Sequence, residues 1–145
     1  MAWLKIFILS TALCWPTSEI EFEKKQMLLG EKKLTVEIAD SIEKRSQGLM
    51  YRQKLKPGQG MLFIHDQPEV AGYWMKNTFI DLSIGFFDEN KKLVEIYDLK
   101  KTPSVLSTRF DQVQSRKKVK YALEVPKGWF KANNIKPGVK FKLID

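Results

Sequence analysis

The stretch from Trp74 to Thr78, WMKNT, places several side chains that can bind a ligand within five residues. If this region forms a strand, Trp74 and Lys76 lie on one face, because side chains alternate along a strand. An indole beside an ammonium group, followed by the Asn77 amide and the Thr78 hydroxyl, can stack on a flat ligand and hydrogen-bond to its edge. A sugar, an aromatic group or a peptide would suit such a surface. In the alternative, Trp74 packs in the core, and Asn77 and Thr78 shape a turn.

Two arginines form a second candidate site. Arg45 and Arg52 are seven residues apart, close to two turns of an α-helix, so on an unbroken helix they could hold an anion between them. Gly48 stands between them and limits the helix. The alternative is structural: an arginine pairs with the Glu124 carboxylate and pins the helix to a strand.

Four motifs occur in a characteristic order along the chain: RSQGLMYR (45–52), GMLF (60–63), WMKNT (74–78) and YALEVPKG (121–128). With these motifs the chain resembles, over about residues 34–144, the bacterial and archaeal family called domain of unknown function 192. The resemblance implies a compact, mainly β domain that is frequently exported and has no established activity.

The family pattern matches residues of all four motifs: Arg45, Gly48, Leu49, Met50, Arg52, Gly60, Met61, Leu62, Phe63, Trp74, Met75, Lys76, Asn77, Thr78, Tyr121, Leu123 and Glu124. The chain departs from it after Thr78. Where the family usually reads Ile-Pro-Leu-Asp, this chain has Asp81 in place of the Pro and Ser83 in place of the Asp. A mechanism that uses the family carboxylate therefore requires Asp81 to replace it from the opposite face of the strand.

An enzyme would need an acid–base pair, and Glu124 and Asp81 are the two carboxylates within the family-like segments. Paired carboxylates at a suitable spacing cleave glycosidic bonds, so this pair is the catalytic candidate for a cell-wall hydrolase or lyase. His65 is the sole histidine, and a Ser-His-Asp triad would have to use it. We expect it instead at the end of a strand, paired with Asp66.

Cofactor signatures are weak. Met50, Met61 and Met75 could bind copper(I) through their thioethers, but each stands beside large apolar residues and suits a core position better. The sequence has no Cys and His cluster with zinc spacing and no phosphate-loop or dinucleotide motif. We therefore expect neither a metal nor a cofactor.

The hydrophobic pattern predicts a mainly β domain, a compact sandwich or barrel with one or two short helices. LTVEIA alternates apolar and polar residues as a half-buried strand does, and Asp40 with Glu43 resembles a helix-capping box ahead of a short helix. The runs 79–87 and 93–99, separated by the polar segment DENKK, are predicted to form a β-hairpin. The segment 100–118 is expected to be a long connection. The predicted strands lie at 34–39, 61–64, 70–75, 79–87, 93–99, 118–125 and 139–144, with a helical turn at 129–134.

The first residues have the layout of a secretory signal: Lys5, an apolar run and then small or polar residues. We predict a signal peptide over 1–18, a lead-in over 19–33 and a single β domain over 34–145. The protein is then exported to the periplasm or the extracellular space. A lipid anchor at Cys14 or an uncleaved signal is the alternative, and we expect membrane contact only in one of these two cases.

The formal charge of +8 is concentrated in the C-terminal part of the chain, since residues 91–145 hold fourteen Lys or Arg against five acids. In an exported protein this favours glycans, peptides or anionic envelope ligands over nucleic acid, although a solvated face explains it equally. Three hypotheses stay open: a binding or accessory module of the cell envelope, which leads; a cell-wall hydrolase or lyase; and a structural protein without a small ligand. The sequence sets no oligomeric state.

Overall fold

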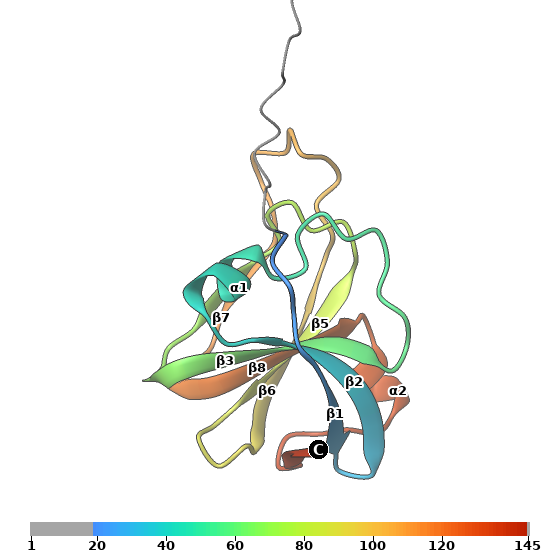
Figure 1. Ribbon diagram of the computed structural model, residues 1–145. Coiled ribbons are helices and arrows are strands. Elements are labelled where there is room, and N and C mark those ends of the chain that lie inside the picture. The colour runs from blue at the N-terminus through green and yellow to red at the C-terminus, as the bar shows by residue number, and fades with distance from the viewer. Residues whose placement is uncertain (1–18, 145) are drawn as a thin grey trace, which may run out of the picture.

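The computed structural model describes residues 19–144 (Figure 1). The strands are β1 (Lys24–Leu29), β2 (Lys32–Ala39), β3 (Gln59–Glu69), β4 (Gly72–Trp74), β5 (Leu82–Phe87), β6 (Leu93–Leu99), β7 (Gln112–Gln114), β8 (Val119–Pro126) and β9 (Phe141–Ile144). Two short helices, α1 (Ile42–Gln47) and α2 (Trp129–Ala132), complete the fold. The domain is thus mainly β with two short helices, as expected.

Seven strands form one sheet in the order β6-β5-β8-β3-β2-β1-β9, and β4 pairs with β7 in a separate ribbon. Neighbouring strands are antiparallel except β2 and β3, which α1 joins by a crossover. The sheet does not close into a barrel within the described residues, although an isolated bridge between Lys92 and Lys140 brings its two ends near each other.

Both faces of the large sheet are covered, which gives two apolar cores. The alternating residues Leu82, Ile84 and Phe86 of β5 face one core, as their spacing predicts. The intervening residues are buried too, because α2 covers them: a Cβ on Gly85 would lie 2.7 Å from the Phe130 ring. This close packing explains why a strand with polar and small residues at alternate positions is nevertheless central in the sheet.

Several element boundaries differ from the sequence prediction. The range 19–33, predicted as a lead-in, contains β1, which lies between β2 and β9 and so belongs to the sheet. The helix cap is Ser41 rather than Asp40, since the Ser41 hydroxyl accepts from the Lys44 amide. The connection 100–118 contains β7, whose register with β4 pairs Tyr73 with Val113.

The predicted signal peptide, residues 1–18, lies outside the described residues. Neither helix of residues 19–144 is long and apolar enough to cross a membrane.

Candidate functional site

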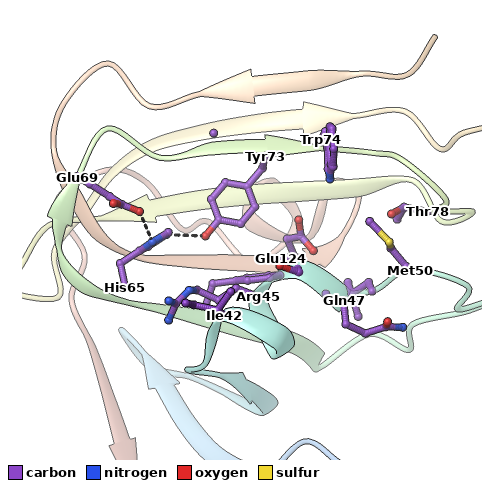
Figure 2. A pocket seen from close by; sticks show the side chains of 15 residues that line it. Ile42, Arg45, Gln47, Met50, His65, Glu69, Tyr73, Trp74, Thr78 and Glu124 are labelled. Atoms are coloured by element: carbon purple, nitrogen blue, oxygen red, sulfur yellow. Dashed lines mark hydrogen bonds and ion pairs between the residues drawn. The ribbon is translucent and has the colours of Figure 1, made fainter. Parts of the chain in front are cut away.

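A cavity of about 380 Å³ opens between α1, β3, β4 and β8 (Figure 2). Polar groups gather inside it on an otherwise apolar wall. Arg45 and Gln47 come from α1, His65 and Glu69 from β3, and Glu124 from β8. Tyr73 and Trp74 of β4 form the opposite side. The cavity therefore collects side chains from segments up to 82 residues apart in the sequence, counted from Ile42 to Glu124.

Glu124 is the most unusual residue of the cavity. It lies on a central strand opposite Met61 and Ile84, and only 5% of its surface is exposed. Burial raises the pKa of the Glu124 carboxyl group from 4.5 to about 8. Among residues 19–144 no hydrogen bond or ion pair of its carboxyl group offsets this burial, and its oxygens keep contact with the cavity. At neutral pH the group is thus a buried carboxylic acid, which can both donate and accept a hydrogen bond.

Three further polar residues form a hydrogen-bonded chain along one wall. Glu69 Oε1 lies 2.7 Å from His65 Nδ1, and His65 Nε2 lies 2.8 Å from the Tyr73 hydroxyl (Figure 2). His65 and Glu69 belong to the same strand and would be about 13 Å apart along a regular one. They meet because β3 bulges here: five steps from Ile64 to Glu69 face only two steps on β8.

Proton positions in this chain follow from the environment of each group. The pKa of His65 lies below its ordinary value, mainly because the ring is buried, although Glu69 opposes the shift. Burial raises the pKa of Tyr73 well above its ordinary value, and the Glu124 carboxylate adds to that shift. The neutral imidazole therefore donates from Nδ1 to Glu69 and accepts at Nε2 from the Tyr73 hydroxyl. The expected pairing of His65 with Asp66 is wrong, because the bulge turns Glu69 toward the ring.

Neither arginine pairs with Glu124, so that structural hypothesis is wrong. Arg45 donates to the carbonyl of Ile64 at 2.8 Å and approaches the Asp66 carboxylate at 3.3 Å. Arg52 forms two parallel hydrogen bonds, both 3.0 Å, with Glu37 of β2. The helix ends at Gln47, before Arg52, so the two guanidinium groups do not share a helix face. Arg45 borders the cavity, whereas Arg52 does not.

The sequence allowed two roles for the segment from Trp74 to Thr78, a ligand-binding surface or part of the core with a turn, and its residues divide between them. Trp74 is 53% exposed at the rim of the cavity, and the Lys76 ammonium lies 5.4 Å from the centre of its ring. Asn77 has a φ of +52° in a turn, where its amide donates to the Tyr51 hydroxyl. Thr78 is buried, donates to the Lys76 carbonyl and borders the cavity. Asn77 therefore shapes a turn, as the structural hypothesis predicted, while Trp74 and Thr78 border the candidate site.

Asp81 does not border this cavity. Its carboxylate accepts from the backbone amide of Lys101 at 2.8 Å, and its carbonyl accepts from Lys127 at 3.2 Å. Asp81 therefore fixes two loops, and the pair of Glu124 with Asp81 is not assembled in the cavity. The second carboxylate that borders the cavity is Glu69.

Sequence reasoning missed Tyr73, Glu69 and Gln47. A signal existed for Tyr73 alone, since the alternation that places Trp74 outward turns Tyr73 inward, toward the sheet. Met61 and Met75 are buried core residues, and residues 19–144 hold no group of three His, Cys, Asp or Glu side chains that could bind a metal ion.

Comparison with known proteins identifies one family and three similar chains of solved structure, including the following two. The family DUF192, described as "Uncharacterized ACR", matches residues 25–143. A crystal structure from Sinorhizobium meliloti 1021, described as that of a putative transcription regulator, has a TM-score of 0.74 and 28% identity, covering 86% of this chain and 97% of that chain. Another, from Novosphingobium aromaticivorans DSM 12444 and of unknown function, has a TM-score of 0.70 and 25% identity, covering 88% and 89%. No curated protein matches the chain. The resemblance inferred from the four motifs is confirmed, and the match begins at residue 25, within β1.

Proposed function

Since the chain belongs to the DUF192 family, whose description assigns no activity, we propose a function from the cavity itself: the domain is a binding module that receives a neutral sugar unit of a glycan. One observation carries the proposal. The carboxyl group of Glu124 is buried at the cavity wall with a pKa of about 8, and no other group among residues 19–144 satisfies it. A ligand hydroxyl can supply the missing hydrogen bond.

The charges around the cavity favour a neutral ligand over an anion. Glu69 and Glu124 are both acids, and the Arg45 guanidinium already interacts with the Ile64 carbonyl and the Asp66 carboxylate. An anionic ligand would face Glu69 and would hinder any ionisation of Glu124. Of the expected ligand classes, glycan, peptide and anion, the charges therefore disfavour the anion.

The rim of the cavity suits a sugar ring. Trp74 is half-exposed there, and both Phe110, at a ring distance of 5.6 Å, and Lys76 hold its indole in place. An ordered indole offers a large apolar contact to the C–H face of a sugar at a low cost in side-chain entropy. Polar groups behind it would bind the ring hydroxyls, as in other sites where a few placed polar groups fix orientation.

We place this module in the cell envelope because residues 1–18 have the composition of an export signal. Envelope glycans would then be the accessible ligands. This part of the proposal can be tested separately, by locating the tagged full chain in cell fractions and determining its N-terminal residue by mass spectrometry.

The binding test is an amide NMR titration of the chain with neutral N-acetylglucosamine oligomers and, for comparison, acidic galacturonate oligomers. Saturable shifts at Tyr73, Trp74 and Thr78 with the neutral series are expected. Trp74→Ala and Glu124→Ala should each weaken binding at least about tenfold, at roughly 1.4 kcal/mol for each lost contact. Glu124→Gln should retain binding, because an amide is also a neutral donor and acceptor. Asp81→Asn is the matched control, since Asp81 lies outside the cavity.

Shifts with the acidic series alone, or equal binding by Glu124→Ala, would overturn the proposal. If neither series binds and the same variants change only stability, the cavity residues are architectural and the third hypothesis gains support.

An acid–base enzyme is a second candidate, favoured specifically by the raised pKa of Glu124. Glu124 would protonate the leaving oxygen, and Glu69 would serve as the second carboxylate in place of Asp81. Release of reducing ends from the same oligomers tests it. The Gln variant separates the two candidates, because Glu124→Gln can bind a sugar but cannot donate a proton to it.

A further inference from the structure

The loop between β6 and β7 carries two adjacent apolar side chains in contact with solvent. Val105 is 60% exposed and Leu106 is 85% exposed, the highest value among the large apolar residues described. Single exposed apolar residues are common on protein surfaces, but two neighbouring ones at the tip of a projecting loop indicate a site that contacts a binding partner or a membrane. Figure 1 shows this loop extending beyond the rest of the domain, next to the end of the molecule at which residue 19 lies.

Positively charged residues flank this tip on both sides in the sequence, toward the base of the loop. Residues 99–110 contain Lys100, Lys101 and Arg109, all exposed, and no acid. Asp111 follows directly, and its carboxylate accepts from the Lys100 amide at 2.8 Å. The loop therefore presents an apolar tip with a cationic collar, a pattern that suits the phosphates and acyl chains of an anionic bilayer.

The base of the loop adds an interfacial aromatic group. Phe110 packs against Trp74 with the ring planes at 87°, and Lys76 lies over the same indole. A half-exposed Trp beside a Lys is typical of residues at the level of lipid headgroups, because both side chains have an apolar body and a polar end.

The loop is held at its root, so its tip has a defined direction. Lys101 donates to Asp81 and Thr102 donates to the Thr78 carbonyl, each at 2.8 Å. At the tip, the amides of Leu106 and Ser107 both donate to Ser104, to its hydroxyl and its carbonyl respectively. This turn directs the Leu106 side chain away from the domain, which costs free energy in water unless the side chain finds an apolar environment.

We propose that loop 100–110 docks the domain on an anionic phospholipid membrane, with Val105 and Leu106 entering the acyl region and Lys100, Lys101 and Arg109 meeting the phosphates. The proposal does not depend on the function proposed above, because the apolar tip and the three cations of the loop lie outside the sugar cavity. Trp74 alone belongs to both surfaces, since it borders the cavity and packs against Phe110 at the base of the loop. Residue 19 lies at the same end of the domain (Figure 1), so an anchor within residues 1–18 would leave the loop facing the same membrane.

The test places an environment-sensitive fluorophore on Leu106→Cys in a full chain that also carries Cys14→Ser. The matched control is the same label on Glu31→Cys, an exposed residue of the β1–β2 turn at the opposite end of the molecule (Figure 1). Both are mixed with vesicles of phosphatidylcholine, with and without phosphatidylglycerol. A severalfold rise and blue shift of emission at position 106 with the anionic vesicles, and none at position 31, is expected. Replacing Lys100, Lys101 and Arg109 by Gln should raise the lipid concentration for half-maximal response roughly a hundredfold at low salt.

The label position distinguishes membrane binding through loop 100–110 from membrane binding through residues 1–18. If the protein sediments with the vesicles while the label at position 106 keeps its aqueous spectrum, the membrane contact comes from elsewhere and the loop proposal is overturned. Equal responses at positions 106 and 31, an unchanged response in the charge variant, or no vesicle association at all would overturn it as well.

Discussion

Tyr73 and His65 come from different strands, yet the Tyr73 hydroxyl lies 2.8 Å from His65 Nε2 inside the cavity that Glu124 borders. The contact depends on the bulge in β3, which also brings Glu69 to the other nitrogen of the ring. A local irregularity of one strand thus assembles three of the polar groups of the site.

The ionisation of Glu124 should make stability depend on pH. Its pKa is about 8 in the folded protein, against an ordinary value of 4.5, so the folded state holds this proton between those two values. Stability from this group is therefore full below about pH 4.5 and is lost as the pH rises toward and through 8. At about 1.4 kcal/mol per pH unit, the total is of the order of 5 kcal/mol. Glu124→Gln should remove this decline in urea unfolding between pH 5 and pH 9, roughly the range of the transition. Asp81→Asn should keep it, and an identical slope in the Gln variant would contradict the assignment.

His65 gives a direct readout of the hydrogen-bonded chain, because it is the sole histidine. Burial lowers the pKa of His65, and Glu69 partly offsets this by raising it. Glu69→Gln should therefore lower the pKa of His65 further. The chemical shift of the imidazole carbon-bound protons against pH measures this. Asp66→Asn is the control and should have a smaller effect, since Asp66 contributes least among the causes of the shift. A rise of the pKa in Glu69→Gln would disprove the contact.

Because α2 approaches β5 closely, replacing Gly85 by Ala should destabilise the protein more than replacing Gly72 by Ala. Gly85→Ala would place a methyl group 2.7 Å from the Phe130 ring, and we expect a destabilisation of about 1–3 kcal/mol from overpacking. Gly72→Ala meets no atom within 4 Å and should change stability little. Thermal or urea unfolding compares the two. Recovery of stability in Gly85→Ala with Phe130→Leu would confirm the cause, whereas equal effects of the two single variants would refute it.

The paired hydrogen bonds of Arg52 with Glu37 should stabilise the segment that follows α1. Because the Arg52 side chain is 37% exposed, we expect a coupling free energy of only about 1 kcal/mol. A double-mutant cycle with Arg52→Ala and Glu37→Gln measures it. The exposed pair of Lys44 with Asp40 offers the comparison and should couple more weakly. A coupling near zero for Arg52 would mean that solvent screens the pair fully.

The sequence predicted those parts of the fold that depend on regular periodicity. The alternation of Leu82, Ile84 and Phe86 indicated the β5 face correctly, and the polar segment after Phe87 indicated a hairpin. The four motifs identified the family. Strand β1 was missed because KKQMLL shows little alternation of its own, and its place in the sheet depends on pairing with β2 and β9.

The candidate site was predictable only in part. Trp74, Thr78, Arg45 and Glu124 all border the cavity, and their residue types had marked them as candidates. Their partners could not be read from the sequence. The contact of His65 with Glu69 requires an irregular strand, and the isolation of Glu124 from Arg45 and Arg52 follows from long-range contacts of those arginines with Asp66 and Glu37. Which of several carboxylates an arginine pairs with is decided by tertiary packing, because the carboxylates carry the same charge.

The strand order has a kinetic consequence for synthesis of the chain. Strand β8 lies between β5 and β3, but among the nine strands of residues 19–144 it is the eighth to emerge. Before residue 119 is available, β5 with β6 and β1 to β3 can form only two fragments, each with an exposed edge where β8 will insert. The last strand, β9, then pairs with the first, β1. The sheet can therefore be completed only after β8 and β9, at the end of residues 19–144, have been made, and folding through such distant pairings is slow. A protein that crosses a membrane before it folds would benefit from this delay.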